Sequence, residues 1–208
     1  MQGFYYYLIL APVLILAITC HECAHAAVAR LCGDPTAQEH GRLTLNPLAH
    51  LDPMGTLLIF LVGFGWGKPV PVNPLRLRYR RADALISLAG PLTNLSLAYL
   101  ASRLLLMRHA AAPQGPATLW EMLLLVAVQL NLGLCFFNLI PIFPLDGSHV
   151  LEQLLPGDVG GRVMRFNRRY GSLILLALIL SARFTHFDPL AAVLEPPIRF
   201  FLQRWLGR

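Results

Sequence analysis

Long apolar runs separated by short polar or proline-rich stretches dominate the chain. The first run extends from Phe4 to Leu31, and its only acidic residue is Glu22. Further runs at 82–106 and 119–140 are also long enough to cross a bilayer, which takes about 20 apolar residues in a helix. Residues 171–182 are expected to form a further full or partial span. The pattern predicts an α-helical polytopic membrane protein with about four to six membrane segments.

Three shorter segments between the first two spans are expected at the membrane surface or just inside it. Residues 54–64 are apolar but too short to cross as a helix, which predicts a re-entrant hairpin. Residues 41–47 alternate enough to predict a short surface strand that ends at Pro47. Alternating prolines in 68–74 exclude a helix and leave an edge strand or a polyproline-like segment.

Composition supports a membrane protein and adds information on its orientation. The 208 residues are 56% hydrophobic and 13% charged, and their mean hydropathy of +0.56 excludes an ordinary soluble protein. We expect one domain over 1–208, with a core at about 4–155 and C-terminal helices of open topology at 156–208. Arginines gather at 76–81 and 162–169, so the net charge of +6 indicates cytoplasmic loops near anionic lipid rather than nucleic-acid binding. We therefore expect a multi-pass protein of the cell membrane (inner or plasma), with its site open to the cytoplasm.

A metal-ligand motif lies inside the first apolar run. His21 and His25 are four residues apart, so on a helix both imidazoles face the same side and can hold one zinc ion. Glu22 beside them is placed to act as a general base. Ionisable residues are costly within a bilayer, and they persist there mainly at functional sites. The histidines precede Leu31 by ten and six residues, which places the site roughly 9–15 Å below that membrane face.

A catalytic zinc ion takes three protein ligands and keeps one position for water. Asp146 is the predicted third ligand, because it follows the third span after two prolines that unwind the helix end, and Gly147 permits a tight turn. If each predicted span crosses the membrane once, Asp146 lies on the same side of the membrane as the end of the first helix, which carries the histidines. A simple Asp-Gly turn is the alternative, and His149 is a competing ligand. We expect one zinc ion per chain.

Two asparagines embedded in apolar runs are candidates for stabilising an oxyanion. Glu22 would take a proton from the zinc-bound water and pass it to the leaving amine. The oxyanion then needs hydrogen-bond donors, and Asn138 and, as a weaker candidate, Asn94 can supply them. A hydrogen bond between helices is the alternative for each amide.

Three motifs occur in a specific order along the chain. Residues 21–25 match H-E-x-x-H, residues 138–147 match N-x-x-P-x-x-x-L-D-G, and residues 90–94 contain a glycine-proline-asparagine element. Together they resemble the site-2 protease family, the zinc intramembrane metalloproteases. Three further segments, at 41–47, 50–53 and 66–74, resemble the compact prokaryotic branch of this family, which has no PDZ domain.

This resemblance implies His21, His25 and Asp146 as zinc ligands and Glu22 as the catalytic base. It also implies a transmembrane protein substrate, cut in or near its membrane segment in regulated intramembrane proteolysis. A metal transporter or zinc-binding sensor is an alternative, but neither needs Glu22 beside the ligands. An inactive homologue that binds membrane proteins is another alternative, but it would have lost a ligand or the base.

The substrate must present an extended peptide, because helical peptide bonds are protected by their hydrogen bonds and side chains. An exposed strand edge can bind an extended segment through main-chain hydrogen bonds. We expect residues 42–46 or 70–73 to provide that edge.

Overall fold

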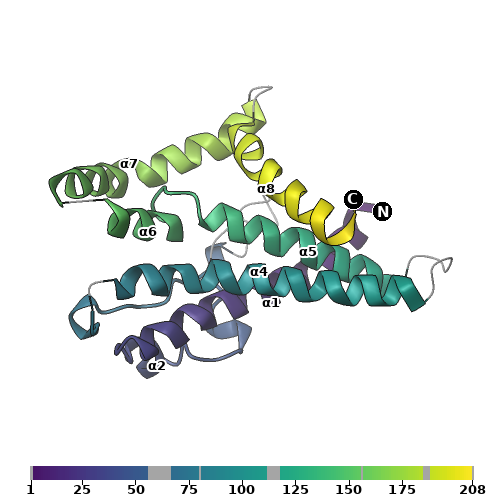
Figure 1. Cartoon of the computed structure of the whole chain (residues 1–208), viewed down its shortest axis with the longest axis horizontal. Helices are drawn as coiled ribbons and strands as arrows, with labels where there is room; N and C mark the ends of the chain where they lie inside the picture. The colour runs from purple at the N-terminus through teal and green to yellow at the C-terminus, as the bar shows by residue number, and fades with distance from the viewer. Residues whose placement is uncertain are drawn as a thin grey trace.

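The computed structural model of the chain is built almost entirely from helices (Figure 1). It describes residues 2–55, 67–79, 81–111, 118–155, 157–184 and 188–207. Within these ranges no sheet forms, and strand pairing is limited to an isolated antiparallel bridge between Leu51 and Gly67. The elements are α1 (Gln2–Leu31), α2 (Thr36–Glu39), η1 (Pro47–Ala49), η2 (Pro74–Arg76), α4 (Ala82–Ala111), α5 (Leu119–Asn138), α6 (Asp146–Leu154), α7 (Gly157–Phe184) and α8 (Pro189–Leu206).

Helices α1, α4 and α5 form the centre of the molecule, and each contacts the other two. Three segments in the described ranges are long and apolar enough to cross a membrane, namely Leu8–Leu31, Ala82–Ala111 and Leu119–Asn138. The three long spans predicted from the sequence are therefore confirmed as helices. The additional membrane segments expected from the sequence are not confirmed.

Small residues let α4 approach both of its neighbours closely, as they do at many membrane helix contacts. Ala98 of α4 is fully buried in an apolar cluster with Leu132 of α5. Nearer its start, α4 contributes Ile86 to a second buried cluster with Ala29 of α1. Residues 90–94 lie between these two clusters, so the apolar packing of α4 holds this segment firmly against α1.

Polar segments between α1 and α4 are tied together by buried hydrogen bonds. Asp34 is fully buried and its carboxylate accepts a bond of 2.6 Å from the backbone N–H of Asn73. Lys68 donates its backbone N–H to the carbonyl of His50 over 2.7 Å, and its own carbonyl accepts a bond from the buried guanidinium of Arg42. The extended backbone from Lys68 to Asn73 is thereby held at both ends.

One predicted surface element is not confirmed, and another lies mainly outside the described residues. The predicted hairpin at 54–64 falls mainly on residues 56–66, which lie outside the described residues. The predicted strand at 41–47 is not confirmed, because this segment forms bends and turns that lead into η1. The side chain of Asn46 accepts a hydrogen bond from the backbone N–H of Leu48, so a local cap replaces the ladder bonds of a strand.

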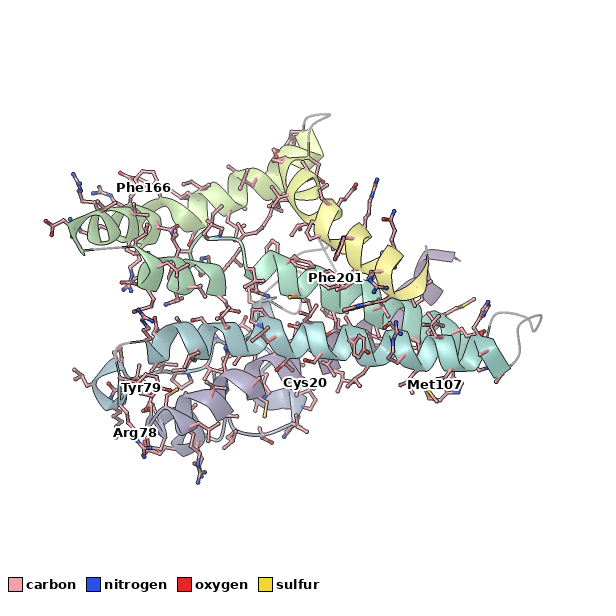
Figure 2. All side chains as sticks on the ribbon, in the orientation of Figure 1. Cys20, Arg78, Tyr79, Met107, Phe166 and Phe201 are labelled. Carbon is pink, nitrogen blue, oxygen red and sulfur yellow. The ribbon has the colours of Figure 1, made fainter. Side chains whose placement is uncertain are left out.

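Helix α8 packs back across α4 and α5. Figure 2 shows Phe201 pointing from α8 toward α5, where its ring centroid lies 5.7 Å from that of Phe136. Arg103 of α4 donates a hydrogen bond of 2.8 Å to the backbone carbonyl of Trp205, near the end of α8. These contacts attach the C-terminal helix to the central helices.

Helix α7 is attached to the segment that follows α5. Asn167 accepts a hydrogen bond of 3.0 Å from the backbone N–H of Phe143 and donates one of 3.2 Å to the carbonyl of Pro141. Gly171 lies so close to Phe143 that an added Cβ atom would be 2.7 Å from its carbonyl oxygen. This contact fixes α7 beside the turn that leads to Asp146.

Candidate metal centre

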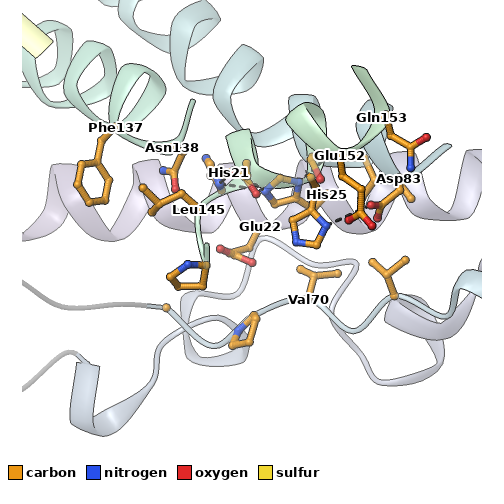
Figure 3. Close-up of a pocket in the computed structure, with 18 of the residues that line it drawn as sticks. His21, Glu22, His25, Val70, Asp83, Phe137, Asn138, Leu145, Glu152 and Gln153 are labelled. Carbon is orange, nitrogen blue, oxygen red and sulfur yellow. Dashed lines mark hydrogen bonds and ion pairs between the residues drawn. The ribbon is translucent and has the colours of Figure 1, made fainter. Parts of the chain in front are cut away.

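Two histidines of α1, labelled in Figure 3, lie close to one aspartate of α6 in the interior of the protein. Nε2 of His21 lies 3.0 Å from Nε2 of His25, as the one-turn spacing predicts. The Oδ2 atom of Asp146 lies 3.2 Å from His21 Nε2 and 3.4 Å from His25 Nε2. The histidines are buried and the aspartate is half-buried. The structure therefore brings together the three residues that the sequence predicts as ligands.

Asp146 reaches the histidines because the chain turns sharply after α5. Helix α5 ends at Asn138, and Asp146 is the first residue of α6. Gly147 packs directly against the end of α5, where an added Cβ atom would lie 2.2 Å from the carbonyl oxygen of Leu139. No side chain fits there, so this glycine allows the close approach that places Asp146.

The outer ring nitrogens of both histidines are already engaged. His25 Nδ1 lies 2.6 Å from the carbonyl oxygen of Ile86, which can only accept, so this nitrogen carries the proton. His21 Nδ1 lies 2.5 Å from Oδ1 of Asn94 and donates to it in the same way. When the two rings are neutral, as metal binding requires, each Nε2 atom therefore carries the lone pair.

This arrangement fits a metal ion. When both imidazoles are neutral, their two nitrogen lone pairs converge with the Oδ2 atom of Asp146, which is buried and has no hydrogen-bond partner. Such a group of acceptors is unfavourable unless a cation lies among them. Separations of 3.0–3.4 Å also match the ligand–ligand distance of roughly 3.3 Å that tetrahedral zinc gives with bonds of about 2.0–2.1 Å. The donor set of two imidazoles and one carboxylate is one that catalytic zinc uses.

Gly90 of α4 lies directly against the two histidine ligands. An added Cβ atom would lie 2.4 Å from His25 Nε2 and 2.5 Å from His21 Nε2. Any side chain at this position would enter the space between the ligands. The glycine therefore keeps the metal position open, a role that the sequence motif alone does not reveal.

Glu22 lies beside the three ligands and is not one of them. Within the described residues Glu22 belongs to neither of the two groups of side chains that could hold a metal ion, and it lines the same cavity as the three ligands. Its Oε1 atom would be 3.8 Å from a Cβ atom on Gly67, so the carboxylate faces the extended segment that follows this glycine. A carboxylate near the metal but free of it can accept a proton.

Comparison with known proteins decides the family. The sequence profile described as Peptidase family M50 matches residues 105–182. YwhC of Bacillus subtilis (strain 168), whose name assigns it provisionally to the zinc metalloproteases, is 43% identical over 185 residues, which cover 85% of this chain and 84% of YwhC. The chain belongs to peptidase family M50, the site-2 proteases. It is thus a metalloprotease, as the sequence predicts.

More distant M50 relatives agree. Rip2 of Mycolicibacterium smegmatis (strain ATCC 700084 / mc(2)155), also named provisionally as a zinc metalloprotease, is 31% identical over 172 residues, covering 80% of this chain and 64% of Rip2. Protease RseP of Photorhabdus luminescens is 33% identical over 85 residues, covering 39% of this chain and 37% of RseP. No solved structure matches the chain. The names of these relatives and the three apolar helices are consistent with a zinc-dependent membrane protein.

The two asparagines of this M50 protease occupy different positions relative to the metal centre. Asn94 is fully buried, its Oδ1 faces His21, and its Nδ2 donates 2.8 Å to Oδ1 of Asn131. Both ends of the amide are engaged, which favours an orienting role for Asn94 over the predicted oxyanion role. Asn138 lines the cavity and donates one Nδ2–H to the carbonyl of Leu134 over 3.0 Å.

Asn131 was not anticipated from the sequence. It lies seven residues before Asn138 in the same apolar run, so the two amides share one face of α5. A second amide on the inward face of a membrane helix is the signal that could have identified it.

A cavity of about 1270 Å³ opens from the metal centre and is shared by several elements. Its walls come from α1, α4, the end of α5, α6 and α7, together with the extended segment after Gly67. Pro69, Val70 and Val72 line it, whereas residues 42–46 do not. The cavity is large enough for a stretch of peptide, since typical ligand pockets measure about 300–1,000 Å³.

A second group of ionisable residues lines the same cavity apart from the metal centre. His149, the competing ligand predicted from the sequence, lies 3.1 Å from Asp83, and their hydrogen bond raises the pKa of His149. Glu152 pairs with Arg168 of α7 at 3.1 Å. These ion pairs link α4, α6 and α7, and His149 belongs to a group with Asp83 and Glu152 that is separate from His21, His25 and Asp146.

Proposed function

We propose that the chain is a zinc-dependent intramembrane endopeptidase that hydrolyses peptide bonds in or near transmembrane segments of other membrane proteins. One zinc ion would be held by His21, His25 and Asp146. The observation that carries this proposal is the convergence of three ligand atoms on one cavity. Two of them come from a helix that is apolar enough to cross a membrane. Bound there, zinc supplies a Lewis acid that acidifies water and polarises a peptide carbonyl.

The protein groups around the ligands supply the remaining chemistry. Glu22 accepts a proton from the attacking water and returns it to the leaving amine. Asn138 lines the cavity and has a second amide N–H beyond the one given to Leu134, which makes it a candidate contact for the oxyanion. Asn94 accepts a hydrogen bond from Nδ1 of His21 and so orients this ring.

Substrate is proposed to enter as an extended segment beside Val70. The sequence left two candidate edges, at 42–46 and 70–73, and the cavity lining supports the second of them. Gly67, at the start of this segment, is adjacent to Glu22, so a peptide paired with the segment would pass the catalytic base. Backbone pairing of this kind is independent of side-chain identity and suits an unwound membrane helix.

Orientation in the membrane is proposed from the distribution of arginines. Figure 2 places Arg78 and Phe166 at one end of the molecule and Met107 at the other. The arginine-rich segments around Arg78 and Phe166 therefore belong to the same end. By the preference of basic loops for the cytoplasm, this end and the cavity opening are assigned to the cytoplasmic face of a multi-pass protein in the cell membrane.

The test is to compare the native protein with Glu22→Gln. Membrane fractions from cells producing either form are analysed for new substrate fragments by mass spectrometry, and zinc content is measured on both purified proteins. We expect Glu22→Gln to retain zinc and to lose cleavage by about 10²–10⁴-fold, the usual contribution of a general base. Fragments that appear equally with both forms would overturn the proposal, as would a native protein that binds no zinc.

A further inference from the structure

Three buried polar side chains form a continuous hydrogen-bonded chain between the central helices. His21 of α1, Asn94 of α4 and Asn131 of α5 are joined by bonds of 2.5 and 2.8 Å. Asn94 is fully buried and Asn131 is 3% exposed, so no solvent competes for these groups. In such surroundings each amide must be satisfied by the protein, and its orientation is set by its partners.

The orientation of Asn131 is set by the backbone of its own helix. Its Nδ2 atom donates a hydrogen bond of 2.9 Å to the carbonyl oxygen of Ala127. A backbone carbonyl can only accept, so the NH₂ group must face it and Oδ1 must face the other way. That oxygen is the atom that receives the bond from Asn94.

The orientation of Asn94 follows from the same argument. Its Nδ2 atom donates to Asn131 Oδ1 over 2.8 Å and lies 3.4 Å from the carbonyl oxygen of Ala17, a second group that can only accept. The Oδ1 atom of Asn94 must therefore face His21. Because this oxygen accepts, Nδ1 of His21 carries the proton and Nε2 keeps its lone pair for the metal.

The two histidines thus depend on supports of different kinds. His25 is held by the backbone carbonyl of Ile86, which cannot rotate or offer a donor. His21 is held by a side-chain amide, which could rotate by half a turn and present its NH₂ group. A rotated Asn94 would favour a proton on His21 Nε2, in the position of the metal.

We propose that Asn131 is a positioning residue that fixes the amide of Asn94 and thereby holds His21 in the tautomer able to bind zinc. This inference rests on the zinc centre of the proposed function. The residue touches neither metal nor substrate, and its effect passes entirely through Asn94.

The experiment is a double-mutant cycle on zinc affinity, measured by competition with a chelator. Asn131→Leu removes the acceptor while keeping the number and branching of the side-chain heavy atoms, and it is expected to weaken zinc binding by about 10-fold, at the low end of the 10–100-fold cost of lost outer-shell partners. Ser102→Ala is the matched control, because Ser102 is fully buried on the same helix as Asn94 and bonds only within that helix or to its neighbour Arg103. It is expected to leave zinc affinity unchanged.

A second set of measurements in the Asn94→Asp variant distinguishes an effect of Asn131 on the orientation of residue 94 from an effect on packing. A carboxylate presents an acceptor whichever way it turns, so His21 keeps its tautomer without help from Asn131. When Asn131→Leu is added to Asn94→Asp, it is expected to cause no further loss of affinity. Equal losses in both backgrounds would show a packing effect and overturn the proposal, and so would an unchanged affinity of the single Asn131→Leu variant.

The protonation of His21 provides a readout that needs no metal. In metal-free protein labelled with ¹⁵N-histidine, the native chain is expected to show His21 protonated at Nδ1, and Asn131→Leu a mixture with the Nε2 form. An unchanged Nδ1 form in that variant contradicts the role of Asn131. A native protein that shows this tautomer but binds no zinc contradicts the proposed function instead, so the two failures are distinguishable.

Discussion

A Cβ atom on Gly90 would lie 2.4 Å from Nε2 of His25. Real Cβ atoms do not approach other atoms this closely, so the position accepts no side chain without displacing a ligand. Gly90 belongs to a helix in a membrane-spanning range, where glycine otherwise weakens the helix by about 1 kcal/mol relative to alanine. Its presence is explained by the metal centre rather than by helix formation.

Gly90→Ala is therefore expected to abolish stoichiometric zinc binding while the helical fold persists. The added methyl group also reaches within 2.5 Å of His21, so both imidazoles would have to move. Zinc content is measured after purification by atomic emission, with circular dichroism to follow the fold. Gly133→Ala on α5 is the control, because nothing lies within 4 Å of an added Cβ atom there. Full zinc content in Gly90→Ala would show that the ligands are arranged differently.

Much of this centre could be predicted from the sequence because the relevant geometry is local. The spacing of His21 and His25 fixes their common face once the run is helical, and the apolar runs define the helices. Asp146 could be predicted as the third ligand because the number of spans places it on the side of the histidines, and because an Asp-Gly pair follows the proline-rich end of a helix. None of these steps requires knowledge of how one helix is rotated against another.

The remainder depends on that rotation. Asn94 was predicted as a donor to an oxyanion, since the sequence shows an amide in an apolar span but not its neighbours. Contact of α4 with both α1 and α5 turns this amide between His21 and Asn131. The expected strand at 41–47 failed for a different reason, because side-chain caps such as that of Asn46 compete with a strand at short range.

Asp34 is expected to make stability depend on pH. Its carboxylate accepts hydrogen bonds from the hydroxyl of Thr36 and from the backbone N–H groups of Asn73 and Thr36. Burial raises the pKa of Asp34, but these bonds and the charge of Arg76 outweigh burial and hold the pKa below its ordinary value. A carboxyl group with a lowered pKa in the folded state stabilises that state above its unfolded pKa of about 3.9. The contribution is lost as pH falls through the lower folded-state value.

Asp34→Asn should accordingly lower the free energy of unfolding at neutral pH by about 1–2 kcal/mol, and the difference from the native protein should shrink below about pH 4. Thermal unfolding in detergent across this pH range is the measurement. Glu39→Gln is the control, since Glu39 forms a surface ion pair with Arg76 and is expected to contribute less than about 1 kcal/mol. A pH-independent difference for Asp34→Asn would rule out this linkage.

The proposed substrate edge can be tested by removing one backbone donor. Val70→Pro deletes an N–H group in a segment that already contains prolines on either side, so little rearrangement is needed. If substrate pairs with this segment, kcat/KM for a cleaved transmembrane substrate should fall by about 2–10-fold, the value of one hydrogen bond of about 0.5–1.5 kcal/mol. Zinc content should not change, because Val70 is no ligand.

Leu45→Pro is the matched variant for the other candidate edge. Leu45 is 67% exposed and lies in the bends that replaced the predicted strand, away from the cavity lining. It is expected to leave kcat/KM and zinc content unchanged. The reverse result, with cleavage reduced by Leu45→Pro and unaffected by Val70→Pro, would transfer the substrate contact to residues 42–46. The cavity beside Glu22 would then need to open toward that segment when substrate binds.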